Sequence, residues 1–225
     1  MYYDSTYILV IVGFIICMIA QNNVKSTFKK YSKIYSKKGI TGQQVAQMIL
    51  KNANITDVGI ARVGGELTDH YDPRSKMVNL SDSVYASSSV AAIGVAAHEC
   101  GHVIQHHMGY KPLIIRNAIV PAVNISSKAA MPLIFIGLIF SISPLITVGI
   151  VLFTAIVIFQ LITLPVEFNA SKRAIEILGN SNMLYDDELE GSGKVLTAAA
   201  LTYIAATIST MLQLIRLILI RQRRD

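Results

Sequence analysis

The sequence predicts a mainly α-helical membrane protein with about four transmembrane helices and one small α+β unit. Only 15% of its 225 residues are charged and 52% are hydrophobic, whereas about 25% of an ordinary soluble domain is charged. Three long tracts of predominantly apolar sequence contain no charged residue, 5–24, 129–166 and 195–215. The only sizeable polar region lies between the first two tracts. Its pattern of short elements predicts the α+β unit.

The count of four helices follows from the lengths of the tracts. About 20 apolar residues are needed to cross a hydrocarbon core of roughly 30 Å. The first and third tracts are therefore expected to cross once each, and the longer second tract twice. A break at 141–144 divides the second tract, and Pro144 cannot continue a helical hydrogen-bond ladder. We expect a membrane hairpin that turns at this break.

Six lysines follow the first tract without an intervening acidic residue. By the positive-inside rule this segment is expected in the cytoplasm and the N-terminus outside. The lysines also suit contact with anionic lipid headgroups, so the basic charge indicates a bilayer and not nucleic acid. Four spans would then place the C-terminal arginines outside, against the same rule. The residues concerned are Lys25, Lys29, Lys30, Lys33, Lys37 and Lys38 near the first tract, and Arg221, Arg223 and Arg224 at the C-terminus.

The polar region shows the start and stop signals of short elements. Thr41 and Gln44 have capping-box spacing, which predicts a helix that runs to about Asn52. Turn-forming residues at 72–75 predict a hairpin. The remaining expected elements are a strand at 58–63, hairpin strands at 67–71 and 76–80, and a following helix capped by Ser87, Ser88 or Ser89.

The sequence His98-Glu99-Cys100-Gly101-His102 lies in this last helix. Residues four apart on a helix are one turn apart on the same face, so both histidines can bind one Zn²⁺ while Glu99 reaches a water on that metal. The motif therefore predicts a catalytic zinc site. The simpler alternative is a helix with two solvated histidines.

The two cysteines do not predict a disulfide. Cys17 falls in the first membrane tract, and Cys100 lies two positions from each motif histidine. That spacing places Cys100 on the opposite side of the helix from a metal. We expect it to be a small buried packing residue.

A catalytic zinc usually has three protein ligands, so one ligand is missing from the motif. His106 and His107 are expected to be polar residues near the helix end. Glu167 is the better candidate, because a membrane hairpin returns it to the membrane face of the zinc helix. Alternatively, Glu167 caps a helix beside Lys172 and Arg173. Competing carboxylates are Glu176, Asp69 and Asp72.

Three blocks of sequence, in this order, resemble the YugP-like family of bacterial membrane zinc metallopeptidases. They are 67–74 (LTDHYDPR), 98–102 (HECGH) and 164–171 (LPVEFNAS). This family is similar to the HtpX and CAAX-type membrane peptidases, which place a membrane hairpin between the zinc helix and a glutamate ligand. The resemblance implies that Glu167 is the third ligand. Those relatives carry Asp four residues after that glutamate, whereas this chain has Ser171, which can still accept an imidazole N–H bond.

The expected function is that of a zinc-dependent endopeptidase acting on membrane or membrane-associated proteins. Zn²⁺ would be held by His98, His102 and Glu167, and Glu99 would act as general base. His70 is a weaker candidate for stabilising the oxyanion. A substrate strand is expected to pair with the hairpin at Met77, Val78, Asn79 and Leu80.

Two other functions stay open. An intramembrane site-two-type protease would need its zinc motif in a full membrane span and an Asp ligand from a later helix. A non-catalytic, zinc-stabilised adaptor would need four protein ligands and no glutamate beside the first histidine. The catalytic site is expected on the cytoplasmic face of a multi-pass cell-membrane protein.

The expected domain organisation follows these boundaries. A membrane anchor (1–24) precedes a zincin-like catalytic unit (25–111), a membrane hairpin (112–166), a ligand-bearing helix and loop (167–194), and a C-terminal membrane helix with a basic tail (195–225).

Overall fold

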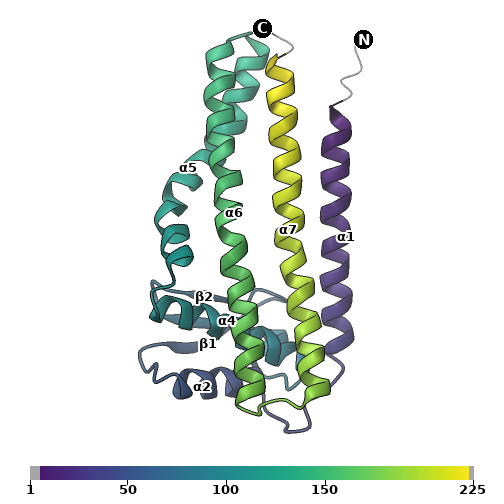
Figure 1. Ribbon diagram of the computed structural model, residues 1–225, viewed down its shortest axis with the longest axis vertical. Coiled ribbons are helices and arrows are strands. Elements are labelled where there is room, and N and C mark those ends of the chain that lie inside the picture. Colours follow the sequence, from purple (N-terminus) through teal and green to yellow (C-terminus); the bar gives the residue numbers. More distant parts are fainter. Residues whose placement is uncertain (1–5, 223–225) are drawn as a thin grey trace. The chain divides into compact units, whose positions relative to one another are not determined.

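The computed structural model describes residues 6–222, which contain seven helices and three strands (Figure 1). The first five residues of the expected membrane anchor (1–24) lie outside this range, and so do Arg223 and Arg224 of the basic tail. In chain order the elements are α1 (Tyr7–Tyr31), α2 (Gly42–Asn52), β1 (Gly59–Val63), β2 (His70–Asp72), β3 (Met77–Ser81), α3 (Asp82–Tyr85), α4 (Val90–His107), α5 (Lys111–Ile139), α6 (Ser143–Asn180) and α7 (Asp186–Gln222).

The chain divides into two compact units. The helical unit comprises Met1–Gln21, Ile114–Pro165 and Leu201–Asp225, and the α+β unit comprises Asn22–Leu113 and Val166–Ala200. Four helices, α1, α5, α6 and α7, are long and apolar enough to cross a membrane. The predicted fold class, a mainly α membrane protein with a small α+β unit, is therefore confirmed.

The helices are longer than the apolar tracts that predicted them. α5 begins at Lys111, well before residue 129, and contains Pro121 and Pro132. α6 contains Pro165 and α7 already begins at Asp186. A helix satisfies its own backbone hydrogen bonds outside a bilayer as well as inside it, so it does not have to end where the apolar tract ends. The expected hairpin break is confirmed, because α5 ends at Ile139 and α6 begins at Ser143.

The hairpin of α5 and α6 in the helical unit depends on a close approach at Gly149. A Cβ atom at this position would lie 2.9 Å from the carbonyl oxygen of Ala130. The small residue brings the two helices together, as in other membrane helix pairs. Leu217 of α7 completes the buried cluster with Ala130, Ile134, Ile146, Ile150, Phe153 and Val157.

Arg216 lies within α7, directly after the last uncharged tract (195–215). Its guanidinium carbon lies 4.1 Å from the centroid of the Tyr7 ring, which is a cation–π distance. An aromatic partner of this kind offsets part of the cost of a charge in an apolar setting. The helix continues through Arg216 to Gln222 without interruption.

The helices of the α+β unit begin as their capping residues predict. The side chain of Thr41 accepts from the Gln44 backbone and the Gln44 side chain accepts from the Thr41 backbone, so the capping box of α2 is confirmed. Of the three candidate serines, Ser89 caps α4, accepting from the Ala92 backbone at 3.2 Å. The apolar face of α2 then packs against α4, and their buried side chains form the core of this unit.

The sheet has the order β1-β3-β2, with β3 parallel to β1 and antiparallel to β2. The expectation that a substrate strand pairs with Met77, Val78, Asn79 and Leu80 is therefore wrong. Both edges of β3 are already hydrogen-bonded within the sheet, so its backbone cannot accept another strand. β1 and β3 pair in parallel although β2 lies between them in the sequence. The turn signals that predict a hairpin do not predict a pairing of this kind. The free edges belong to β1 and β2.

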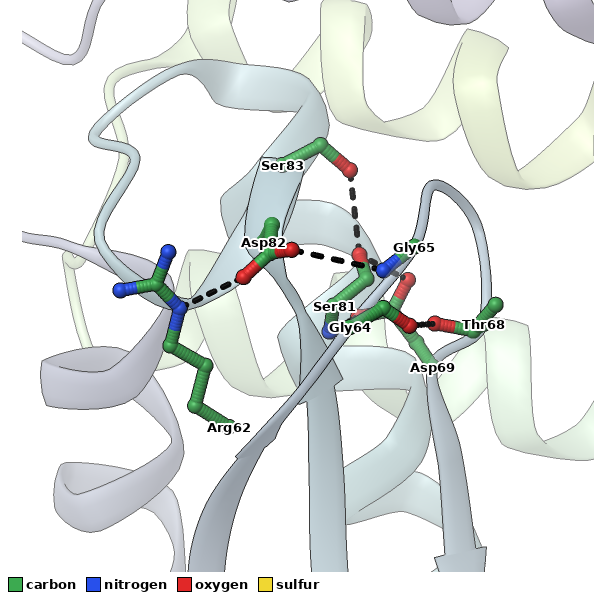
Figure 2. A network of polar contacts seen from close by, with 8 residues as sticks. All are labelled: Arg62, Gly64, Gly65, Thr68, Asp69, Ser81, Asp82 and Ser83. Atoms are coloured by element: carbon green, nitrogen blue, oxygen red, sulfur yellow. Dashed lines mark hydrogen bonds and ion pairs between the residues drawn. The ribbon is translucent and has the colours of Figure 1, made fainter.

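A network of polar contacts anchors the loop between β1 and β2 (Figure 2). The Asp69 carboxylate accepts hydrogen bonds from the backbone and hydroxyl of Ser81 at 2.7 and 2.9 Å. Asp82 accepts from Arg62 at 2.6 Å and from the Gly65 backbone at 3.4 Å. Burial raises the pKa of Asp69, while the bonds from Ser81 oppose this shift. The loop thus fixes the start of the edge strand β2.

Candidate metal centre

His98 and His102 lie one turn apart on α4 with their rings close together. The ring centroids are 4.7 Å apart and the rings are nearly perpendicular. Both side chains are partly buried, with 14% and 12% of their surface exposed. The helix therefore presents two imidazoles side by side in a sheltered position.

Glu167 of α6 meets both histidines. Its Oε2 atom lies 3.4 Å from Nε2 of His98 and 3.6 Å from Nε2 of His102. The side chain of Glu167 is only 3% exposed. All three residues belong to the α+β unit, because Glu167 lies just beyond the boundary at Pro165.

The three side chains form a donor set that suits zinc. One ligand atom from each of His98, His102 and Glu167 lies within 4.8 Å of the others, and no other such group of three occurs within residues 6–222. Two imidazole nitrogens and one carboxylate oxygen are typical of a catalytic zinc, which keeps its fourth position open. The residues present therefore fit this metal.

The other ring nitrogens of the two histidines are hydrogen-bonded within the protein. Nδ1 of His98 lies 3.1 Å from the hydroxyl of Ser171, and Nδ1 of His102 lies 3.0 Å from Oε1 of Gln105. Such contacts orient the rings of metal-binding histidines and leave Nε2 for the metal. Ser171, four residues after Glu167, thus contacts one of the two histidines, His98.

Gly101 allows α4 and α6 to come close enough for Glu167 to reach the histidines. A Cβ atom on Gly101 would lie 2.7 Å from the carbonyl oxygen of Ala170. The face of α6 that carries Glu167 is itself lined by small or apolar buried side chains, Val166, Ala170, Ala174 and Leu178. Glycine in the motif therefore serves packing between two helices, at the expense of helix propensity.

We expect Gly101→Ala to displace α6 from α4 and to weaken zinc binding, because the new methyl group would meet backbone that cannot turn aside. Zinc affinity and the thermal unfolding temperature should both fall. The measurements are competition with a chelator and thermal unfolding in detergent. Gly193→Ala is the matched control, since its Cβ would be 3.9 Å from Ile175 in ordinary contact. An unchanged zinc affinity in Gly101→Ala would contradict the packing argument.

The site collects negative charge around the histidines. Glu99 follows His98 directly and is buried, with 7% of its surface exposed. Burial lowers the pKa of His102, but the carboxylates of Glu167 and Glu99 outweigh burial and raise this pKa. An environment that favours a cation on the imidazole also favours a divalent metal ion beside it.

The competing carboxylates are engaged elsewhere. Asp69 is bonded to Ser81, and Asp72 accepts from Arg74 and Ser75 in the turn before β3. Glu176 pairs with Lys172 at 3.7 Å on the exposed side of α6. The structure thus brings only Glu167, of the four candidate carboxylates, to the histidines.

His106 and His107 lie apart from the three grouped side chains. Nδ1 of His106 contacts the Tyr71 hydroxyl at 2.9 Å. Both histidines line a cavity of about 200 Å³ together with Tyr71 and Val103. This cavity lies beside the last turn of α4, beyond His102.

His70 contacts its own strand neighbours. Its Nδ1 lies 2.9 Å from the carbonyl oxygen of Thr68, and its Nε2 lies 3.3 Å from Nδ2 of Asn79. Because the carbonyl can only accept, Nδ1 carries the proton in the neutral ring. Nε2 then has no proton to donate to an oxyanion. This arrangement argues against the catalytic role considered for His70.

Cys100 is fully buried on the side of α4 that faces α2, and its thiol lies 3.8 Å from the carbonyl oxygen of Ala46. Burial raises the pKa of this thiol. Cys17 lies in α1, and both cysteines are free. The expected packing role of Cys100 is confirmed.

Gln105 and Asn169 belong to the site but were not predicted from the sequence. Gln105 is completely buried, and its amide donates to the carbonyl oxygen of Val166 at 2.8 Å and to Oδ1 of Asn169 at 3.0 Å. The available signal was its position three residues after His102, which places both side chains on one face of a helix.

Comparison with known proteins agrees with this site. A family model described as "Putative neutral zinc metallopeptidase" matches residues 6–222. The chain belongs to this family. It is 48% identical over 202 residues to a Bacillus subtilis (strain 168) protein named "Putative membrane protease YugP", and the match covers 89% of each chain. The resemblance to the YugP-like family is thus confirmed. No solved structure matches the chain.

Proposed function

We propose that this member of the neutral zinc metallopeptidase family is a membrane-bound, zinc-dependent endopeptidase that cleaves membrane or membrane-associated proteins. The observation that carries the proposal is the convergence of His98, His102 and Glu167 beside a buried Glu99. The family and the similar membrane protease support peptide substrates, and the four long apolar helices support a multi-pass membrane protein.

The residues of the site have distinct roles in this reaction. Zinc held by His98, His102 and Glu167 would polarise the scissile carbonyl and lower the pKa of a bound water towards roughly 7. Glu99 accepts a proton from the attacking water and passes it to the leaving amine. Ser171 and Gln105 hold the two imidazoles so that Nε2 faces the metal position.

The edge strand β2 takes over the role that was expected for β3. An extended peptide can add to an exposed sheet edge through main-chain hydrogen bonds. β2 runs beside α4, as the contact between Tyr71 and His106 shows. The cavity beside these two residues can receive a side chain of such a peptide.

Two observations disfavour the alternative functions. α4 is not among the helices of residues 6–222 that are apolar enough to span a membrane, as a site-two-type protease would require. Within the same residues the metal group has three ligands, whereas a structural zinc adaptor needs four.

Removal of the metal tests the proposed activity. The protein purified in detergent should contain about one zinc per chain and should cleave an unfolded protein such as casein. Dialysis against a chelator should remove both zinc and cleavage, and added Zn²⁺ should restore them together. Zinc content by mass spectrometry and peptide release are the measurements. Cleavage that survives complete removal of zinc would contradict the proposal.

We further propose that the α+β unit lies on the cytoplasmic face, as the lysine-rich segment indicates. Lys33 and Lys172 both belong to this unit and are exposed. Cysteines introduced at these two positions, one at a time, should be protected from a membrane-impermeant thiol reagent in intact cells and should react after lysis. Reaction of either cysteine in intact cells would contradict the proposed orientation.

A further inference from the structure

Gln105 is the most fully enclosed polar side chain near the metal centre. It lies in the last two turns of α4 with no exposed surface. A buried amide must find partners for its oxygen and for both of its N–H groups. The three partners here are Nδ1 of His102, the backbone carbonyl of Val166 and Oδ1 of Asn169.

The direction of these hydrogen bonds is determined by the Val166 carbonyl. A backbone carbonyl can only accept, so the amide nitrogen of Gln105 must face Val166. The amide oxygen then faces His102 and can only accept as well. Nδ1 of His102 must therefore carry a proton, and in the neutral ring Nε2 is left with its lone pair.

His98 has no such constraint. Its Nδ1 contacts the hydroxyl of Ser171, which can donate or accept. The two histidines of the site therefore differ. Gln105 determines which nitrogen of His102 carries the proton. Ser171 is compatible with either tautomer of His98.

The same amide also links the two helices that carry the ligands. Gln105 is on α4, and its two donor bonds end on residues 166 and 169 of α6, on either side of Glu167 in the sequence. Asn169 is in turn held by Arg173, which donates to its Oδ1 at 2.8 Å. One side chain thus orients a histidine and holds the backbone next to the carboxylate.

We propose that Gln105 is a positioning residue that fixes His102 as its Nδ1–H tautomer for metal binding. This inference rests on the proposed zinc site, but its tests measure metal affinity and tautomer and do not use peptide cleavage. A failure of the proposed peptidase activity would therefore leave these results interpretable.

The first test compares two substitutions in the full chain in detergent. Gln105→Met keeps the volume but makes no hydrogen bonds, and zinc affinity is expected to fall about 10- to 100-fold. Gln105→Glu keeps an acceptor for the Nδ1 proton of His102, so most of the zinc affinity should be recovered. Zinc affinity is measured by chelator competition, and the unfolding temperature of the metal-free protein is measured in parallel.

The comparison separates positioning from packing. If Gln105 serves only packing, zinc affinity should follow the unfolding temperature of the metal-free protein across both variants. We expect instead that both variants are less stable but that only Gln105→Met loses zinc affinity. Wild-type affinity in Gln105→Met, or equal losses in both variants, would overturn the proposal.

A second measurement uses the wild-type protein and does not depend on any variant at Gln105 folding. Solid-state nitrogen NMR of ¹⁵N-histidine-labelled, metal-free protein at alkaline pH reports which ring nitrogen carries the proton. The chain has five histidines, so His102 can be assigned from the signals absent in His102→Asn. We expect His102 as a single Nδ1–H tautomer. An Nε2–H tautomer, or a mixture, at His102 would overturn the proposal.

Discussion

Glu99→Gln is expected to retain zinc and to lower peptide cleavage by about 10²- to 10⁴-fold. Glutamine has nearly the same size and shape, so the buried position beside His98 stays filled. Its neutral amide oxygen is a poor base and cannot take the proton of the attacking water at neutral pH. The measurement is cleavage of casein by the two proteins after their zinc contents have been matched.

Glu176→Gln is the matched control for this experiment. It makes the same chemical change on α6, at an exposed residue paired with Lys172. Cleavage should stay at the wild-type rate in this variant. Equal rates for Glu99→Gln and the wild type would exclude the role assigned to Glu99. A loss of zinc in Glu99→Gln would show that this residue supports the metal instead.

Glu167→Ala and Glu167→Gln are both expected to lose most of the bound zinc and, with it, peptide cleavage. Alanine removes the ligand and leaves a void at a buried position. Glutamine preserves the volume but replaces the anionic oxygen by a neutral one, which is a weaker zinc ligand. A common loss in the two variants therefore reports ligation and not packing. Zinc per chain after dialysis is the measurement.

His106→Ala supplies the control for the metal experiment. This histidine follows His102 by one turn of α4, but its ring contacts Tyr71. The variant should keep the wild-type zinc content. Stoichiometric zinc in Glu167→Ala, or loss of zinc in His106→Ala, would contradict the assignment of His98, His102 and Glu167 as the ligand set.

The positions that could be predicted from sequence are those governed by local spacing. The four-residue spacing of His98 and His102 places both imidazoles on one face of any helix. The capping signals at Thr41 and Ser89 act on the first turn of their own helices. The membrane helices follow from the lengths of apolar tracts. The proximity of Glu167 was inferred from a hairpin and a family resemblance, and the structure supplies the distances.

The sequence by itself thus determined the helical membrane class, the histidine pair and the adjacent Glu99, because these depend on residues within a few turns of one another. Only the tertiary structure decided which strand is at the edge, since parallel pairing of β1 with β3 joins distant segments. It also decided why the motif contains Gly101, and that Gln105 joins His102 to α6. These features depend on contacts between α4 and α6, and the sequence of either helix alone does not specify where the other lies.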